Sequence, residues 1–238
     1  MASSGHGGLR RDALRAALSL LETARDPRRA DRMYALLDVV TATPLMDACF
    51  ARQAQRSDLK ELVISRYSAP WPDPDAMRSL RPDSLGACLQ RRSDALGLPA
   101  LRPPAVPEGS DATYLMHRLR ITHDIHHLIL GLPTTVAGEA AAAAYYAAAL
   151  QSPSATAVLT AWMTHGLMAP DEHASIWKGI RFATDLALDW SSCLLAWRWE
   201  DAWDRPLQDW RTLVGLDPLL KRSPFQEELG RWITPRQG

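Results

Sequence analysis

Residues 112–130 read ATYLMHRLRITHDIHHLIL, and this stretch decides the fold class. Apolar residues recur through it at helical spacing, and it is too long for an ordinary strand. Gly131 and Pro133 follow directly, and both are residue types that end helices. The next segment, TTVAGEAAAAAYYAAALQ (134–151), is rich in alanine, the strongest helix former. The sequence therefore predicts two consecutive helices joined by a short Gly-x-Pro break.

Helical spacing also dominates the rest of the chain, whereas strand signals are weak. Pro44 suits the first turn of a helix, and Asp83 or Ser84 suits an N-cap. Further helices are expected over 9–24, 32–42, 44–55, 73–80, 83–96, 155–167 and 207–214, with one long helix or two abutting ones over 175–203. The Pro-rich segment 98–111 is expected to be a loop. These patterns predict an all-α, single-domain helical bundle.

The domain is expected to span residues 9–220, between a disordered N-terminus (1–8) and a C-terminal tail (221–238). Lys+Arg and Asp+Glu are equal at 27 each, so net charge gives no reason to expect a nucleic-acid partner. The cysteines Cys49, Cys88 and Cys193 are odd in number and far apart, which argues against a disulfide framework. No apolar run reaches about 18 residues, and no signal core is found. We therefore expect a cytoplasmic protein without a membrane-spanning helix, which can lie against a membrane.

Polar residues with metal-binding side chains interrupt the apolar stretch that opened this section. On a helix of about 100° per residue, His127 lies about 40° from His123, and Asp124 about 100° from it. Arg120 falls in the same sector, where it could bind a substrate carboxylate or phosphate, brace Asp124, or form a solvated salt bridge. His126 points about 60° to the other side of His123 and is excluded from the site.

Two histidines at i and i+4 can bind one metal ion, because successive helical turns place their side chains on one face. Asp124 can add a ligand or orient one, and Glu139 can return across the Gly-x-Pro break on the next helix. A His₂-carboxylate set suits zinc, with iron or manganese as alternatives. His pairs also occur on helices without metal, their nitrogens bonded to backbone carbonyls, and that reading stays open.

At these residues the sequence resembles the coenzyme Q biosynthesis protein 4 family. The family's hallmark, His-Asp-x-x-His, eleven residues and then Glu, stands complete as His123, Asp124, His127 and Glu139. A second block, WEDAW (199–203) followed by Arg211 and VGL (214–216), agrees with the family's C-terminal pattern. The resemblance covers about residues 30 to 216.

The resemblance implies an all-helical, often dimeric fold with a metal, commonly zinc, held by the four motif residues. It also implies an internal hydrophobic cavity for an isoprenoid tail and peripheral contact with membranes. Its best-studied members are linked to oxidative decarboxylation of a polyprenylated aromatic ring. We therefore expect an enzyme, a metal-dependent decarboxylase or other lyase or oxidoreductase, that acts on an aromatic or quinone-type carboxylic acid.

The catalytic candidates are Arg120 and Asp124, and the metal-ligand candidates are His123, Asp124, His127 and Glu139. The pathway is expected to be ubiquinone-like or that of a specialised metabolite, with a hydrophobic, prenylated substrate and a homodimer. The alternative is a non-catalytic isoprenoid-lipid-binding scaffold with a structural metal, which organises a biosynthetic complex. Four protein ligands around the ion would favour the scaffold, and an open position would favour the enzyme.

Four further features can be interpreted from the sequence. The tryptophans of residues 190–203 either pack in the core or line a ligand cavity. Glu200 among them either pairs with an arginine or faces that cavity. Arg118 lies away from the metal sector and is expected at the surface or an interface. Leu14, Leu18 and Leu21 give the first helix an apolar face, which is expected to pack in the core.

Overall fold

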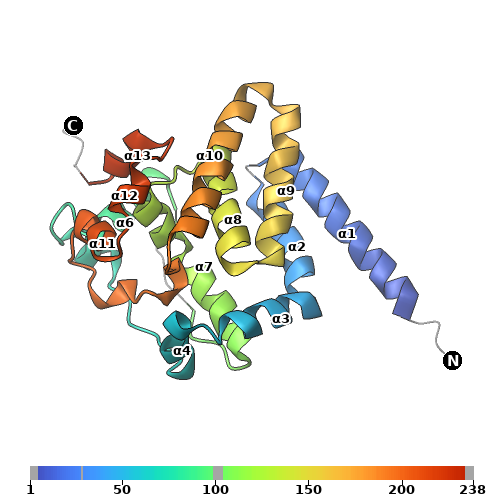
Figure 1. Ribbon diagram of the computed structural model, residues 1–238, viewed down its shortest axis with the longest axis horizontal. Helices are drawn as coiled ribbons and strands as arrows, with labels where there is room; N and C mark the ends of the chain where they lie inside the picture. Colours follow the sequence, from blue (N-terminus) through green and yellow to red (C-terminus); the bar gives the residue numbers. More distant parts are fainter. Residues whose placement is uncertain (1–4, 28, 99–103, 234–238) are drawn as a thin grey trace. The chain divides into compact units, whose positions relative to one another are not determined.

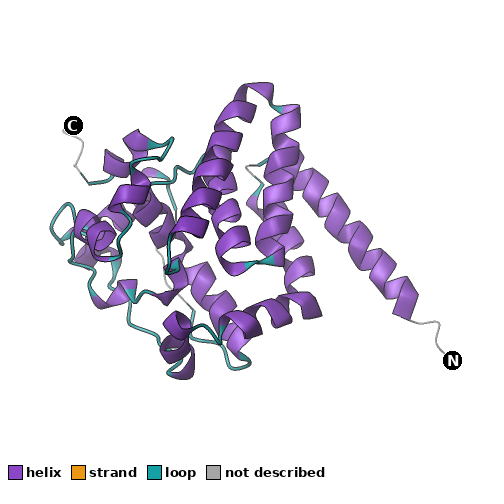
Figure 2. Cartoon of the chain, viewed as in Figure 1, coloured by secondary structure: helices purple, strands orange, loops and turns teal. Residues whose placement is uncertain are grey.

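In the computed structural model, residues 5–27, 29–98 and 104–233 are described, and they form helices and loops. Thirteen α-helices, α1 to α13, and two short 3₁₀ turns occur in these ranges, without a strand (Figures 1 and 2). In the same ranges, Ser84 and Pro206 form an isolated antiparallel β-bridge. The all-α expectation is therefore confirmed.

The chain divides into two compact units that alternate along the sequence. One unit comprises Met1–Arg52 and Thr134–Leu188, and the other comprises Gln53–Pro133 and Asp189–Gly238. The first contains α1 (Gly5–Arg25), α2 (Ala30–Thr41), nearly all of α3 (Pro44–Gln53), α8 (Val136–Leu150), α9 (Pro153–Met168) and α10 (Pro170–Asp189).

The first unit is built around a small core where α1, α2 and α9 meet. Its buried centre is Ala24, Leu36 and Ala161, and Ala16 and Leu20 pack against it. The expected apolar face of α1 lies elsewhere: Leu14, Leu18 and Leu21 are more than half exposed. The expectation of core packing for these leucines is wrong, because α1 packs through another face, which contains Ala16, Leu20 and Ala24.

The second unit contains α4 (Ser57–Ile64), α5 (Pro74–Arg78), α6 (Leu85–Ala95), α7 (Asp111–Leu130), α11 (Leu207–Leu213), α12 (Asp217–Leu220) and α13 (Gln226–Arg231). The helix that the sequence marks most clearly is α7. Ser110 caps its N-terminus by accepting a hydrogen bond from the Thr113 amide. Gly131 ends it in the left-handed conformation at φ 63°. After Pro133, Thr135 caps α8 through the Gly138 amide.

Residues 190–203 do not continue the helix before them, so the expected helix over 175–203 ends at Asp189. The segment instead forms two 3₁₀ turns, Leu194–Ala196 and Trp199–Asp201. Side chains take up its backbone carbonyls: the Trp199 indole donates to Leu194 O, and Arg118 donates to Leu195 O. Because these carbonyls already have partners, the segment does not need an α-helical ladder.

Three short helices, α4, α12 and α13, were not predicted from the sequence. The N-cap of α6 is Ser84, one of the two residues that were expected there, and not Asp83. Helix α3 begins at Pro44, as predicted. Of the expected disordered N-terminus, residues 5–8 belong to α1, and residues 1–4 lie outside the described part of the chain. The expected tail contains α13, and its residues 234–238 lie outside that part, as do 99–103 of the expected loop.

Among the described helices, none is by itself both long and apolar enough to cross a membrane. One consecutive pair, Asp31–Thr41 and Pro44–Gln53, meets that threshold only when joined, and its axis bends by 81°.

Candidate metal centre

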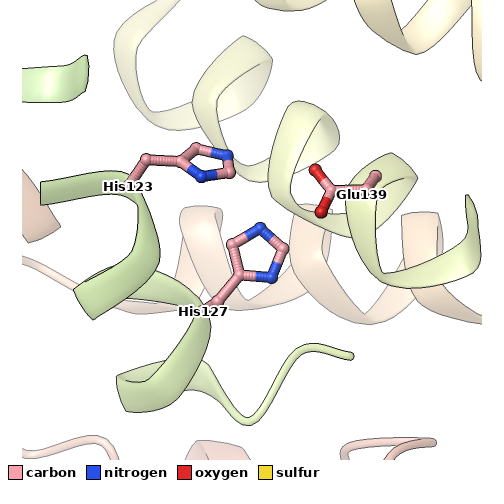
Figure 3. A group of neighbouring side chains, drawn as sticks. All are labelled: His123, His127 and Glu139. Carbon is pink, nitrogen blue, oxygen red and sulfur yellow. The ribbon is translucent and has the colours of Figure 1, made fainter. Parts of the chain in front are cut away.

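Two histidines and a glutamate form a group of potential metal ligands in the described chain. His123 and His127 stand one turn apart on α7, with ring centroids 4.6 Å from one another. Glu139 lies in the first turn of α8. One ligand atom from each of the three residues lies within 4.8 Å of the others (Figure 3). The group contains three of the four metal-ligand candidates of the sequence, and Asp124 is the candidate outside it.

The turn after α7 orients His127. Its ring is buried, and its Nδ1 lies 3.2 Å from the backbone oxygen of Leu132. The Leu132 amide donates in turn to the His127 backbone oxygen at 2.8 Å. With Nδ1–H donated to a carbonyl, the tautomer leaves the lone pair of Nε2 for a ligand. Gly131, between these two residues, has the left-handed conformation at φ 63°.

Asp124 lies beside the two histidines but outside the group of three. One of its carboxylate oxygens is 3.8 Å from His123 Nδ1 and 3.6 Å from a guanidinium nitrogen of Arg92. Burial by itself would raise the pKa of this carboxyl group. The hydrogen bond and charge of His123, with the charges of Arg92 and His127, more than offset burial and lower the pKa to about 2. Asp124 is therefore a carboxylate at neutral pH.

The other candidates on α7 divide by helix face. Arg120 is exposed, so its proposed contact with a substrate stays a prediction. His126 is buried, with its ring 6.3 Å from that of Trp199. Burial lowers the pKa of His126 well below its ordinary value, so the ring is neutral. It is not among the grouped ligands.

The donor set fits a divalent cation of the zinc, iron or manganese type. In a tetrahedral site, two ligand atoms each about 2.1 Å from the ion lie about 3.4 Å apart. The ligand atoms of the group lie within 4.8 Å of one another, so side-chain movements on the order of 1 Å would bring them to coordination distances. Two imidazoles and one carboxylate are common zinc ligands and leave positions for water or substrate.

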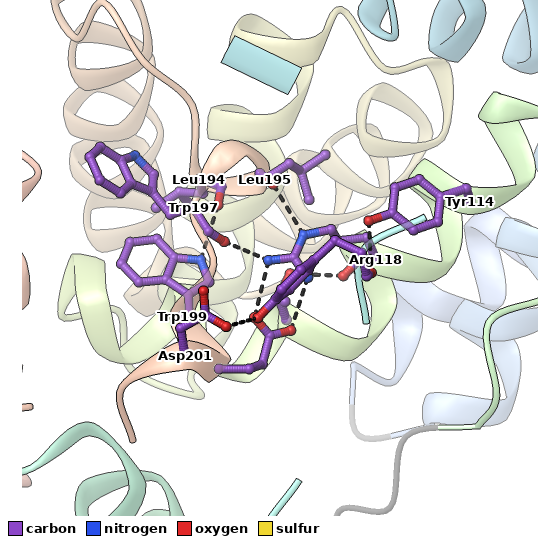
Figure 4. A network of polar contacts seen from close by, with 10 residues as sticks. Tyr114, Arg118, Leu194, Leu195, Trp197, Trp199 and Asp201 are labelled. Carbon is purple, nitrogen blue, oxygen red and sulfur yellow. Dashed lines mark hydrogen bonds and ion pairs between the residues drawn. The ribbon is translucent and has the colours of Figure 1, made fainter. Parts of the chain in front are cut away.

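From the sequence, Arg118 is expected at the surface or an interface, and this expectation is wrong. It is 1% exposed and not at the surface, and its guanidinium pairs with Glu200 at 2.9 Å. It also donates to the backbone oxygens of Leu195 and Trp197 (Figure 4). Glu200 thus pairs with an arginine, one of its two expected roles. One sign of this contact is visible in the sequence, because Glu200 is a charged residue among tryptophans. Its partner, Arg118, could not be identified from sequence spacing.

A second buried arginine secures the last turn of α7. Arg211 of α11 donates to the backbone oxygens of Leu128 and Ile129, and to that of Leu229. Burial lowers the pKa of Arg211 to about 10. The guanidinium thus adds hydrogen bonds to carbonyls at the C-terminal end of α7, next to His127. Arg211 belongs to the C-terminal block of the resemblance, and the structure places it against the ligand-bearing helix.

The described chain is thus that of an all-helical protein with a candidate metal centre. Two histidines one turn apart on one helix and a glutamate at the start of the next form this centre. The model of the family described as "Coenzyme Q (ubiquinone) biosynthesis protein Coq4" matches residues 11–219. The chain belongs to the Coq4 family, and the resemblance seen in the sequence is confirmed over a longer stretch than expected.

Named relatives agree with this assignment. The chain is 28% identical over 213 residues to the "Ubiquinone biosynthesis protein COQ4, mitochondrial" of Paracoccidioides lutzii, an alignment that covers 84% of this chain and 70% of the relative. It is 34% identical over 128 residues to the corresponding protein of Aspergillus flavus, covering 50% and 44%. A crystal structure of a proposed ubiquinone biosynthesis protein from Nostoc punctiforme shares the fold, with a TM-score of 0.73 at 22% identity, covering 85% of this chain and 97% of that one.

Proposed function

We propose that this protein is a metal-dependent enzyme of ubiquinone-type biosynthesis that decarboxylates an aromatic or quinone-type carboxylic acid. Membership of the Coq4 family supports the pathway. The observation that supports the metal is the group of His123, His127 and Glu139, whose ligand atoms lie within 4.8 Å of one another. The proposed ion is zinc, with iron or manganese as alternatives.

A bound divalent ion would supply Lewis acidity toward a carboxylate or ring oxygen. His127 would offer Nε2, because its Nδ1 is held by the Leu132 carbonyl. Arg120 is exposed in the same helical sector and would hold the negative charge of the acid. In the proposed reaction the ring carbon keeps the bonding electron pair and takes a proton as carbon dioxide leaves. An oxidative form would need molecular oxygen as the oxidant.

The substrate is proposed to be hydrophobic and prenylated, and the protein is proposed to act as a homodimer that contacts membranes peripherally. Its fungal relatives carry mitochondrial names, whereas the proposed location of this chain is the cytoplasm. No role in nucleic-acid binding is proposed.

The first test measures bound metal by elemental analysis and identifies co-purified lipid by mass spectrometry, in one preparation of the full chain. Elemental analysis should find one divalent ion per chain in the wild type and its loss in His127→Ala. His117→Ala is the matched control, because His117 lies on the same helix outside the group, and it should keep the ion. A wild type that takes up no ion even after supplementation contradicts the proposal.

The second test measures catalysis directly. Carbon dioxide release from a carboxyl-labelled, polyprenylated aromatic acid should require the metal-loaded protein and should fall in His127→Ala. Arg120→Gln should raise KM more than it lowers kcat if the arginine binds the acid. Stoichiometric metal and co-purified isoprenoid lipid without any release would instead support the non-catalytic scaffold.

A further inference from the structure

His165 connects three helices of the first unit through one buried ring. It lies on α9 and is 9% exposed. Its Nδ1 lies 2.7 Å from the backbone oxygen of Ala24, in the last turn of α1. Its Nε2 lies 3.5 Å from a carboxylate oxygen of Glu172, in the first turn of α10. One side chain thus meets the end of α1 and the start of α10 at the same time.

Both groups that face the ring are hydrogen-bond acceptors. A carbonyl oxygen cannot donate, so Nδ1 must carry the proton of the contact with Ala24. In a neutral ring Nε2 then holds a lone pair, and the Glu172 carboxylate faces it with another. Nε2 of His165 is buried and makes no hydrogen bond within the described part of the chain. The imidazolium form, which donates at both nitrogens, is the form that suits both neighbours.

Further charged groups lie around the ring, on α1, α2 and the turn between them. Arg32 pairs with Glu22 at 2.7 Å. Arg29 pairs with Asp31 at 2.8 Å, so carboxylates offset both of these guanidinium charges. Arg25 is exposed to solvent, and Glu172 is the carboxylate that contacts the ring. The charged residues that line the open cavity of about 720 Å³ beside His165 are Glu22, Arg25, Asp26, Arg29, Arg32 and Glu172.

The place of the ring at the end of α1 gives its charge a second effect. The C-terminal end of a helix carries a partial negative charge, so a cation is favourable there. A hydrogen bond from a charged donor is also stronger than one from a neutral donor. Protonated His165 therefore binds the Ala24 carbonyl more strongly than neutral His165 does, and it gains the contact with Glu172 as well.

We propose that His165 is a pH-dependent latch, which in its protonated form fastens the end of α1 to α9 and α10. The ring gains the Glu172 contact together with the proton, so the latch is complete at the acidic end of the imidazole range, about pH 5 to 8. As pH rises through that range the ring loses the proton, and Nε2 and the carboxylate face each other as acceptors. The end of α1 then opens more often. This latch is independent of the metal centre.

Hydrogen exchange of the full chain at about pH 5.5 and pH 8.0, corrected for the intrinsic exchange rate at each pH, tests the latch. The amides of residues 20–26 should be roughly 5-fold less protected at the higher pH, the size expected for one net hydrogen bond. Glu172→Gln should lose most of this pH dependence, because its amide group can donate to the neutral Nε2. His165→Gln should lower the protection at acidic pH and should show no pH dependence.

His173→Gln is the matched control. His173 follows Glu172 on α10, but its Nδ1 faces the backbone oxygen of Gly166 at 3.2 Å, so this variant should keep the wild-type pH dependence. His127→Ala should keep it too, because His127 belongs to the other unit.

Equal protection of residues 20–26 at both pH values in the wild type overturns the latch. A Glu172→Gln variant with the full wild-type pH dependence also overturns it, and so does loss of that dependence in His173→Gln. Circular dichroism of each variant at both pH values shows whether it is folded, and exchange is compared among folded variants.

Discussion

Arg118 on α7 and Glu200 in the second 3₁₀ turn form a buried ion pair, with both side chains 1% exposed and 2.9 Å between nitrogen and oxygen. The same guanidinium bonds the backbone oxygens of Leu195 and Trp197, so it holds the irregular segment 190–203 against α7. Arg118 and the histidine ligands lie on different faces of one helix. The contact therefore stabilises the helix that carries the candidate centre without belonging to the centre.

Glu200→Ala should strongly destabilise the protein, because it leaves the Arg118 guanidinium buried without its counter-charge. Loss of one partner of a buried pair costs about 3–5 kcal/mol. Arg118→Met/Glu200→Leu should lose less, since it leaves no buried charge. The free energy of unfolding from urea titration measures both effects. A single variant no worse than the double variant would show that the pair is not desolvated.

Gly131→Ala should destabilise the chain and weaken metal binding. Gly131 has φ 63°, and an added Cβ would meet Leu229, whose Cγ would lie 2.8 Å and Cα 3.2 Å away. Gly215→Ala is the matched control, because its φ is 75° and nothing lies within 4 Å of the added Cβ. We expect about 1 kcal/mol for Gly215→Ala from backbone strain alone, and clearly more for Gly131→Ala. Equal losses in urea titration, with equal zinc affinities, would contradict this expectation.

Tyr114 should make the stability of the protein depend on alkaline pH. Burial raises the pKa of its phenol from 10 to about 12, and its hydroxyl donates to the Tyr67 backbone oxygen at 2.9 Å. The folded protein holds this proton more tightly than the unfolded chain. The contribution is thus complete below about pH 10 and is lost as pH rises through about 12.

Tyr114→Phe should therefore lose less stability than the wild type between pH 9 and pH 11 in urea titrations. Tyr34→Phe is the control, because Tyr34 is 49% exposed. Its free energy of unfolding should fall with pH as steeply as that of the wild type. Parallel curves for wild type and Tyr114→Phe would show that the phenol does not titrate differently on folding.

Leu18 and Leu36 should respond very differently to truncation, although the sequence marks both as apolar helical positions. Leu18 on α1 is 53% exposed, whereas Leu36 on α2 is 1% exposed in the core with Ala24 and Ala161. Leu36→Ala should cost about 2–5 kcal/mol, and Leu18→Ala should stay within about 0.5 kcal/mol. A large loss for Leu18→Ala in urea titration would show that this face of α1 is covered in solution.

Local pattern was enough to predict the helices that carry the candidate centre. The bounds of α7 and α8 follow from apolar spacing, the alanine run, Gly131 and Pro133, because caps and breaks act within a few residues. The grouping of His123 with His127 follows from 3.6 residues per turn. Helical periodicity failed over 190–203, where side chains from α7 and from the segment itself satisfy the backbone.

The sequence by itself determined the fold class, the family and the identity of the metal-competent residues. Only the tertiary structure decided that Leu14, Leu18 and Leu21 face outward, that Arg118 is buried on Glu200, and that Arg92 reaches Asp124. A helical wheel gives the direction in which a side chain points, but not the residues that it contacts. The partner of a charge or an apolar face depends on the packing of residues far apart in the chain, here by 82 positions for Arg118 and Glu200.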